Sequence, residues 1–114
     1  MKESYKKYVE YITLKSFNIM IDDSDVNDYF TLEEIKLYSV DKKRRSLAAR
    51  WLIKKILIKH FNNNLSYKDI SITNEKNGKP ILKINDIEIT DTIFISMSHS
   101  RLRASGMVVI DNGQ

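Results

Sequence analysis

The spacing of apolar residues changes along the chain, from a helical rhythm in the first part to alternation in the second. Residues 44–61 carry apolar side chains nearly all round a helix, which is typical of a buried helix. Residues 30–39 predict a shorter helix, because Thr31 and Glu34 have the spacing of a capping box. Before them, residues 8–14 predict a first strand and residues 16–30 a short helix and loop.

The alternating rhythm begins after Asn62-Asn63-Asn64. Isoleucines at 70 and 72 precede the stretch "NEKNGKP", and Ile81, Leu82 and Ile84 follow it. Asn77-Gly78 is a strong turn signal, so this region predicts a β-hairpin. Two further strands are predicted over 92–100 and 104–111. The pattern indicates one α+β domain over residues 1–114, with a mainly antiparallel sheet packed on one long central helix.

Four cations interrupt the apolar surface of the long helix. At 100° per residue, Arg50 and Lys54 form one stripe, and Lys55 and Lys59 form another. Like charges one turn apart repel by roughly 0.2–0.5 kcal/mol unless an anion lies between them. Two interpretations remain open at this point: the long side chains reach water past the core, or they bind an anion. Trp51 suits the apolar helix surface better than a platform for stacked bases, which favours phosphate over nucleic acid.

Composition and charge narrow the classes of function. The net charge of +4 suits an acidic partner, and the absence of cysteine excludes disulfides and thiolate chemistry. The sequence has no long apolar run and a polar start, which predicts a cytoplasmic protein with neither signal peptide nor membrane span. His60 and His99 are the two histidines, and their spacing does not predict a zinc site.

His99 ends an apolar strand face. It shares this face with Ile93, Ile95 and Met97, at the point where the strand stops. The neighbouring serines cannot pair with it as nucleophiles, because adjacent strand residues point to opposite faces. A binding role and a histidine without a function at a sheet edge both remain open.

Four segments in register over roughly residues 30–111 resemble one family. They read "FTLEEIKLYS", "SLAARWLIKKILIK", "NEKNGKPIL", and "ISMSHS" followed by "ASGMVVID". In this order they resemble the holo-acyl-carrier-protein synthase group of the 4'-phosphopantetheinyl transferases. The resemblance implies a small α+β fold and a homotrimer with active sites between protomers. It also implies magnesium-assisted transfer of phosphopantetheine from coenzyme A to an acyl carrier protein in fatty acid or polyketide biosynthesis.

The resemblance also implies roles for individual residues. Arg50, Lys54 and Lys59 match the helix positions that would hold the coenzyme A phosphates, and Lys59 would also act in catalysis. Lys79-Pro80 matches the family's Gly-Lys-Pro segment, and His99 matches the histidine of its Ser-His motif, near the phosphate end of the cofactor.

This chain departs from the family pattern at its metal site. The metal-binding glutamate is replaced by Lys55, which then becomes a candidate coenzyme A contact, and the N-terminal Gly-x-Asp motif is missing. By spacing, Glu10 is the nearest stand-in for the metal ligand and a catalytic carboxylate. Residues 62–64 replace family glycines, and the stretch 81–95 is too short for the extra helix of many members. Magnesium binding therefore stays open, as do two alternatives to transfer: an inactive relative that binds coenzyme A or a carrier protein, and a basic nucleic-acid-binding module.

Overall fold

The computed structural model describes residues 5–41, 44–85 and 91–111, and it has the predicted α+β composition. The elements follow one another as β1 (Tyr5–Thr13), α1 (Leu14–Met20), α2 (Val26–Tyr29), α3 (Leu32–Tyr38), α4 (Arg45–His60), the 3-10 turn η1 (Tyr67–Asp69), β2 (Ile70–Asn74), β3 (Pro80–Ile84), β4 (Thr92–His99) and β5 (Arg103–Asp111). The capping box of Thr31 and Glu34 is present at the start of α3, as predicted.

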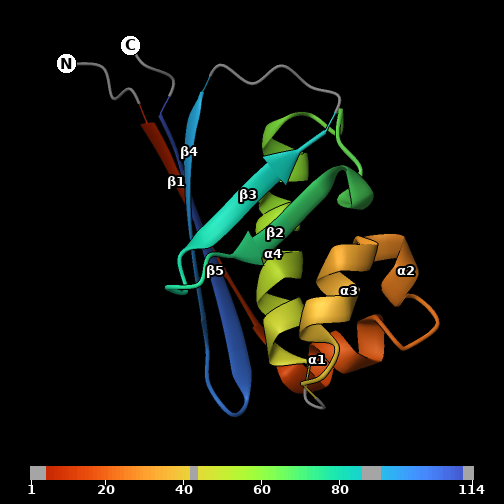
Figure 1. Ribbon diagram of the computed structural model, residues 1–114. Coiled ribbons are helices and arrows are strands. Elements are labelled where there is room, and N and C mark those ends of the chain that lie inside the picture. Colours follow the sequence, from red (N-terminus) through yellow and green to blue (C-terminus); the bar gives the residue numbers. More distant parts are fainter. Residues whose placement is uncertain (1–4, 42–43, 86–90, 112–114) are drawn as a thin grey trace.

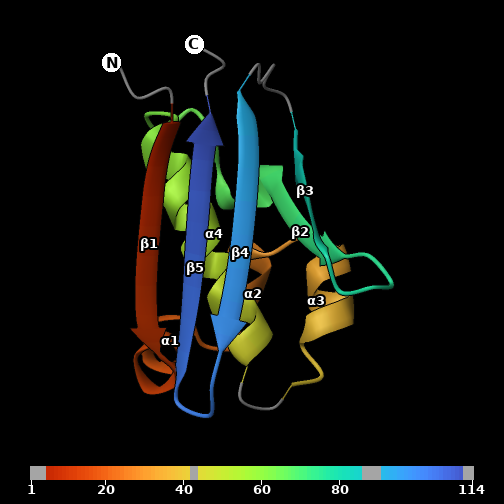
Figure 2. The same cartoon turned by 90° about the vertical axis from the view of Figure 1, so that its left-hand side faces the viewer.

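The long helix α4 packs against two antiparallel sheets. Strands β1, β5 and β4 form a three-stranded sheet in that order, and β2 and β3 form a two-stranded hairpin. Figure 2 shows the three strands side by side with α4 behind them, and Figure 1 shows the hairpin crossing in front of α4, with the three-stranded sheet to its left. The prediction of antiparallel strands packed on a long helix is confirmed, with the strands divided between two sheets.

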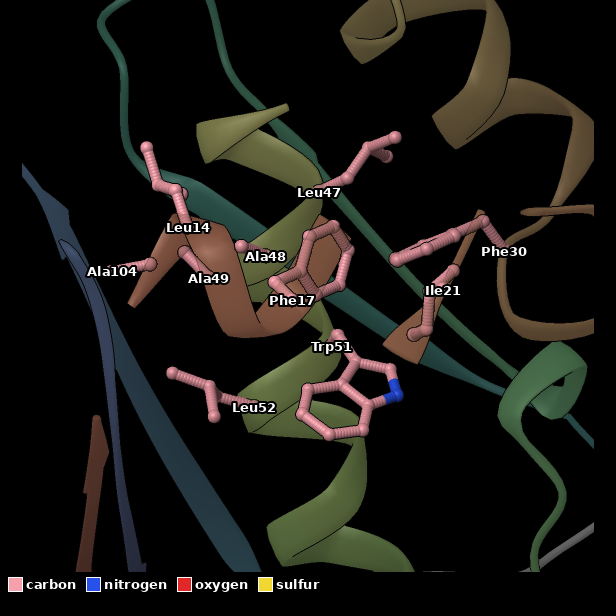
Figure 3. Packing of buried hydrophobic residues seen from close by; sticks show 10 residues of the cluster. All are labelled: Leu14, Phe17, Ile21, Phe30, Leu47, Ala48, Ala49, Trp51, Leu52 and Ala104. Atoms are coloured by element: carbon pink, nitrogen blue, oxygen red, sulfur yellow. The ribbon is translucent and has the colours of Figure 1, made fainter. Parts of the chain in front are cut away.

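A hydrophobic core surrounds α4, which explains why its apolar residues run nearly all round the helix. One cluster joins α4 to α1 and to the residue after α2, with Phe17 packed edge-on against Trp51 at 6.0 Å between ring centroids (Figure 3). A second cluster joins the later turns of α4 to β2 and β5. Gly106 of β5 allows a close approach, because a Cβ there would lie 3.2 Å from side-chain atoms of Leu52 and Ile53. None of the described helices is long and apolar enough to cross a bilayer.

Residues with left-handed backbone angles follow α4 and occur in the hairpin loop. Asn62 and Asn63 follow the helix with φ angles of 56° and 64°, and asparagine is one of the few residues besides glycine that tolerates this region. The two asparagines thus take the backbone conformation that glycine adopts readily. In the predicted hairpin, Gly78 has a φ of 89° within a loop closed by a hydrogen bond from Glu75 N to Lys79 O.

A buried ion pair joins α4 to α3. The Lys54 ammonium donates to Glu34 Oε1, and both side chains are 0% exposed. It also donates to the carbonyl oxygens of Tyr29 at 2.9 Å and Tyr67 at 3.1 Å. These three acceptors match the three N–H donors of an ammonium group, so the buried charge is fully bonded.

Glu34 is equally well bonded on the other side of the pair. Its Oε1 accepts the backbone N–H of Thr31 at 2.9 Å, and its Oε2 accepts the backbone N–H of Ile72 at 3.0 Å. A single carboxylate therefore caps α3, neutralises Lys54 and bonds the central residue of β2. Burial itself lowers the pKa of Lys54, and the facing Glu34 carboxylate opposes that shift.

Removing either partner should destabilise the fold strongly. Lys54→Met leaves Glu34 as an uncompensated buried charge, and we expect the free energy of unfolding to fall by about 3–5 kcal/mol. Glu34→Gln should act in the same direction, and the double variant should lose less than the sum of the two. Urea unfolding followed by circular dichroism measures these changes. Lys36→Met, at an exposed position of α3, is the control and should stay within about 0.5 kcal/mol. A Lys54→Met protein as stable as the control would contradict this assignment.

His60 gives the fold a pH dependence with a defined sign. Its Nδ1 lies 2.9 Å from the Tyr8 hydroxyl, and burial, followed by the nearby Lys6 charge, lowers its pKa below the ordinary 6.5. Between the lowered pKa and 6.5 the unfolded chain binds more protons than the folded chain, so the His60 contribution to stability increases with pH and levels off above about 6.5. We expect the stability difference between wild type and His60→Gln, measured by urea unfolding from pH 5 to 8, to grow with pH and then become constant. A difference that shrinks as pH rises would show the opposite sign.

Candidate coenzyme A site

A hollow of about 230 Å³ forms where α4, the β2–β3 loop and the end of β4 meet. Three predicted site residues from distant parts of the chain line it, namely Arg50, Pro80 and His99. The remaining wall comes from Ser46, Ala49, Asn74, Gly78, Ile95, Ser96 and Met97. The fold therefore brings the basic helix, the Gly-Lys-Pro segment and the Ser-His segment to one place.

Arg50 is held rigidly in the wall of this hollow. Its Nε donates to Ile72 O at 2.8 Å, Nη1 to Ser46 O at 3.1 Å, and Nη2 to Asn74 Oδ1 at 3.3 Å. The guanidinium carbon also lies 3.6 Å from the centroid of the Tyr38 ring. Burial lowers the pKa of Arg50, which is 3% exposed. These bonds fix the guanidinium in the wall of the hollow, where its positive charge can act on an anion.

His99 and Lys79 lie at exposed positions around Pro80. His99 ends β4 opposite Ala104 of β5, at the rim of the hollow. Lys79 lines a larger groove of about 550 Å³ between β3 and β4, and Pro80 belongs to both the groove and the hollow. The predicted contacts of this segment thus face two adjoining depressions.

Lys55 and Lys59 lie on another flank of α4. Lys59 follows Arg50 by nine residues, about two and a half turns, so the two side chains point to opposite sides of the helix. Both lysines are exposed, and the Lys55 ammonium lies 5.2 Å from the centroid of the Trp51 ring. Within the described residues neither lysine has a hydrogen bond or an ion pair.

Glu10 lies on the face of β1 that packs against α4. It is half-buried on the same face of β1 as Tyr8, which bonds to His60 of α4, and Ile12, which packs on the core. Its partner in the sheet is Gly106, which contacts Leu52 and Ile53 of α4. These neighbours set Glu10 level with the middle turns of α4. Among the described residues Glu10 has no hydrogen bond or ion pair.

Lys54 belongs neither to the hollow beside Arg50 nor to the flank of Lys55 and Lys59, because its three N–H donors are used inside the fold. The interpretation that Arg50 and Lys54 reach water past the core is wrong, since both are buried and bonded to protein acceptors. A contact between Lys54 and coenzyme A stays a prediction. The sequence did not reveal Glu34 as the anion for Lys54, although the capping box had already singled out this residue.

The residues present do not fit a magnesium site of the kind that the family resemblance implies. Magnesium prefers oxygen ligands in octahedral geometry, usually one or two carboxylates with substrate phosphates. Here the flank offers the Glu10 carboxylate and two ammonium groups, and α4 contains no aspartate or glutamate. In the parts of the chain that the structure describes, no three His, Cys, Asp or Glu side chains gather as a metal cluster.

The chain is similar in sequence to proteins of known function, although no model of a known protein family matches it. A holo-acyl-carrier-protein synthase of Geobacillus sp. strain WCH70 is 32% identical over 100 residues, covering 82% of each chain. The same enzyme of Mycoplasma capricolum is 34% identical over 79 residues, covering 67% of this chain and 68% of that protein.

A solved structure agrees in fold. The holo-acyl-carrier-protein synthase from Bacillus anthracis, in complex with CoA (3',5'-ADP), superimposes with a TM-score of 0.78 over 94% of this chain and 96% of that chain, at 23% identity. The matches to the two sequence relatives cover 67–82% of this chain, and the fold agrees with the solved structure over 94% of it. The chain therefore belongs to the holo-acyl-carrier-protein synthase family.

Proposed function

We propose that this protein transfers 4'-phosphopantetheine from coenzyme A to a serine of an acyl carrier protein. The observation that carries the proposal is the hollow in which Arg50, Pro80 and His99 meet, in a chain of this family. Arg50 places a guanidinium charge at a fixed position in the wall of the hollow, and guanidinium groups pair well with phosphate oxygens. The structural relative from Bacillus anthracis was solved with CoA (3',5'-ADP), which supports the same ligand here.

The proposed reaction is a phosphoryl transfer. The serine oxygen forms a bond to the β-phosphorus of coenzyme A, and the bond from this phosphorus to the bridging oxygen breaks. The bridging oxygen leaves as part of adenosine 3',5'-bisphosphate, and the serine proton passes to a base. We assign Glu10 as the carboxylate that accepts this proton, and Lys59 as the cation that stabilises charge on the bridging oxygen.

We further propose that the active site lies between two copies of the chain in a homotrimer. The hollow with Arg50 and His99 and the flank with Lys59 lie on opposite sides of α4, so one coenzyme A molecule reaches both groups most simply where two protomers meet. The outer face of the three-stranded sheet supports self-association, because it exposes the large apolar side chains of Val9, Tyr11 and Phe94.

One end of the molecule suits the acidic carrier protein. The turn between β4 and β5 contacts α1 through a hydrogen bond from Leu14 N to Leu102 O. Three exposed basic residues surround this contact, namely Lys15, Arg101 and Arg103, and the exposed Leu102 adds apolar surface. Basic residues around an apolar side chain complement an acidic helix with an apolar stripe.

Mass spectrometry tests the transfer directly. After incubation with coenzyme A and candidate apo-carrier proteins, we expect one carrier to gain the mass of one phosphopantetheine group. His99→Ala and Lys59→Met should slow transfer at least tenfold at an unchanged melting temperature, because both side chains are exposed. Lys68→Met removes another exposed lysine and is the control, expected to keep full activity. Saturable coenzyme A binding without product from any carrier would favour an inactive relative. Binding of generic DNA that coenzyme A does not affect would favour the nucleic-acid module.

Mixing two inactive variants tests whether the site is shared between protomers. His99→Ala damages one side of the proposed interface and Lys59→Met the other, so an interface with two intact sides forms again when subunits of both kinds assemble. Random assembly of equal amounts gives about a quarter of the interfaces two intact sides, and we expect about a quarter of the wild-type activity after co-refolding. A mixture no more active than the separate variants would place the whole site within one protomer.

A further inference from the structure

We propose that the cation facing the coenzyme A diphosphate in this protein is the Lys55 ammonium group, and that diphosphate binding needs no divalent metal ion. This inference rests on the proposed function and concerns the flank of Glu10, Lys55 and Lys59. It assigns Lys55 a role as a fixed positive charge within the binding site.

The positive charges on this flank have no neighbouring acidic side chain to balance them in the described part of the chain. Lys55 and Lys59 are exposed, stand one turn apart, and have no acidic partner within the described residues. Two like charges at this spacing repel each other, and an anion placed between them removes the repulsion. A diphosphate carries its charge on oxygens of two adjacent phosphates, so each ammonium group can pair with one of them.

Trp51 keeps the Lys55 ammonium group in place. The indole is 5% exposed and packed against Phe17, so it is a rigid part of the core. The Lys55 ammonium lies 5.2 Å from the Trp51 ring centroid, within the range of a cation–π contact. A lysine held over a rigid ring loses less side-chain freedom on binding an anion than one that moves freely in water.

The same position disfavours a metal ion. Glu10 lies level with the middle turns of α4, and a divalent ion bound to the diphosphate that pairs with Lys55 would lie close to the Lys55 charge. Two cations competing for the same phosphate oxygens repel each other, and the lysine is covalently fixed there. Lys55 therefore replaces the ion as the neutralising charge, and Glu10 stays available to accept a proton.

Calorimetry of coenzyme A binding tests this assignment. With metal-free protein we expect the Kd in EDTA and in millimolar magnesium to agree within about twofold. Lys55→Glu should bind at least tenfold more weakly in EDTA and recover in magnesium, because the new carboxylate joins Glu10 as a metal ligand. Lys55→Met should bind at least tenfold more weakly in both buffers. Lys36→Glu makes the same charge change at an exposed position of α3 and should stay within about twofold of wild type.

The possible outcomes distinguish a failure of this inference from a failure of the proposed function on which it rests. Wild-type binding that disappears in EDTA and returns with magnesium would overturn the metal-free assignment and leave the transferase proposal intact. An unchanged Kd for Lys55→Met would also overturn it, and this result remains decisive should Lys55→Glu fail to fold. Wild-type protein that binds no coenzyme A in either buffer would remove the proposed function itself.

Discussion

The buried pair of Lys54 and Glu34 is the interaction on which the rest of the structure depends. An ammonium group without water must be paired and fully bonded, and here its acceptors come from Tyr29 at the end of α2, from α3 and from η1. The pair also determines where the hairpin lies. Glu34 accepts the backbone N–H of Ile72, and Arg50 donates to the carbonyl oxygen of the same residue. Both backbone groups at the centre of β2 are thus bonded to charged side chains, and the hollow beside Arg50 takes its shape from this arrangement.

The two basic stripes of α4 carry the same charge, but one is buried and the other is exposed. Arg50 and Lys54 face α3 and the hairpin, which supply acceptors, and they become part of the folded core. Lys55 and Lys59 face a flank without such acceptors among the described residues, and they stay exposed. The residue type is therefore a poor guide to function in this helix. The difference lies in what the rest of the chain places opposite each side chain.

Local signals made the helices and the hairpin predictable. What could not be predicted depends on contacts between residues far apart in the sequence. The helical spacing of α4, the capping box at Thr31 and Gly78 in the hairpin loop are encoded within a few residues each, and the structure agrees with all three. The order of segments was enough to indicate the family. The partner of Lys54 could not be found in this way, because Glu34 precedes it by twenty residues and its local role as a cap already explained its presence. The division of the strands into two sheets likewise depends on how β3 and β4 pack, which alternation within each strand does not encode.

The separation of roles along α4 also explains how a lysine can occupy position 55. The charges that hold the fold together lie on the buried stripe, where reversing Lys54 would leave Glu34 facing another carboxylate. Position 55 is exposed, so a change of charge there hardly affects stability and acts almost entirely on whatever binds the flank. The helix can therefore carry a carboxylate or a cation at this position without loss of structure. Under the proposal that this flank binds the coenzyme A diphosphate, the residue at position 55 determines whether a lysine or a metal ion neutralises it.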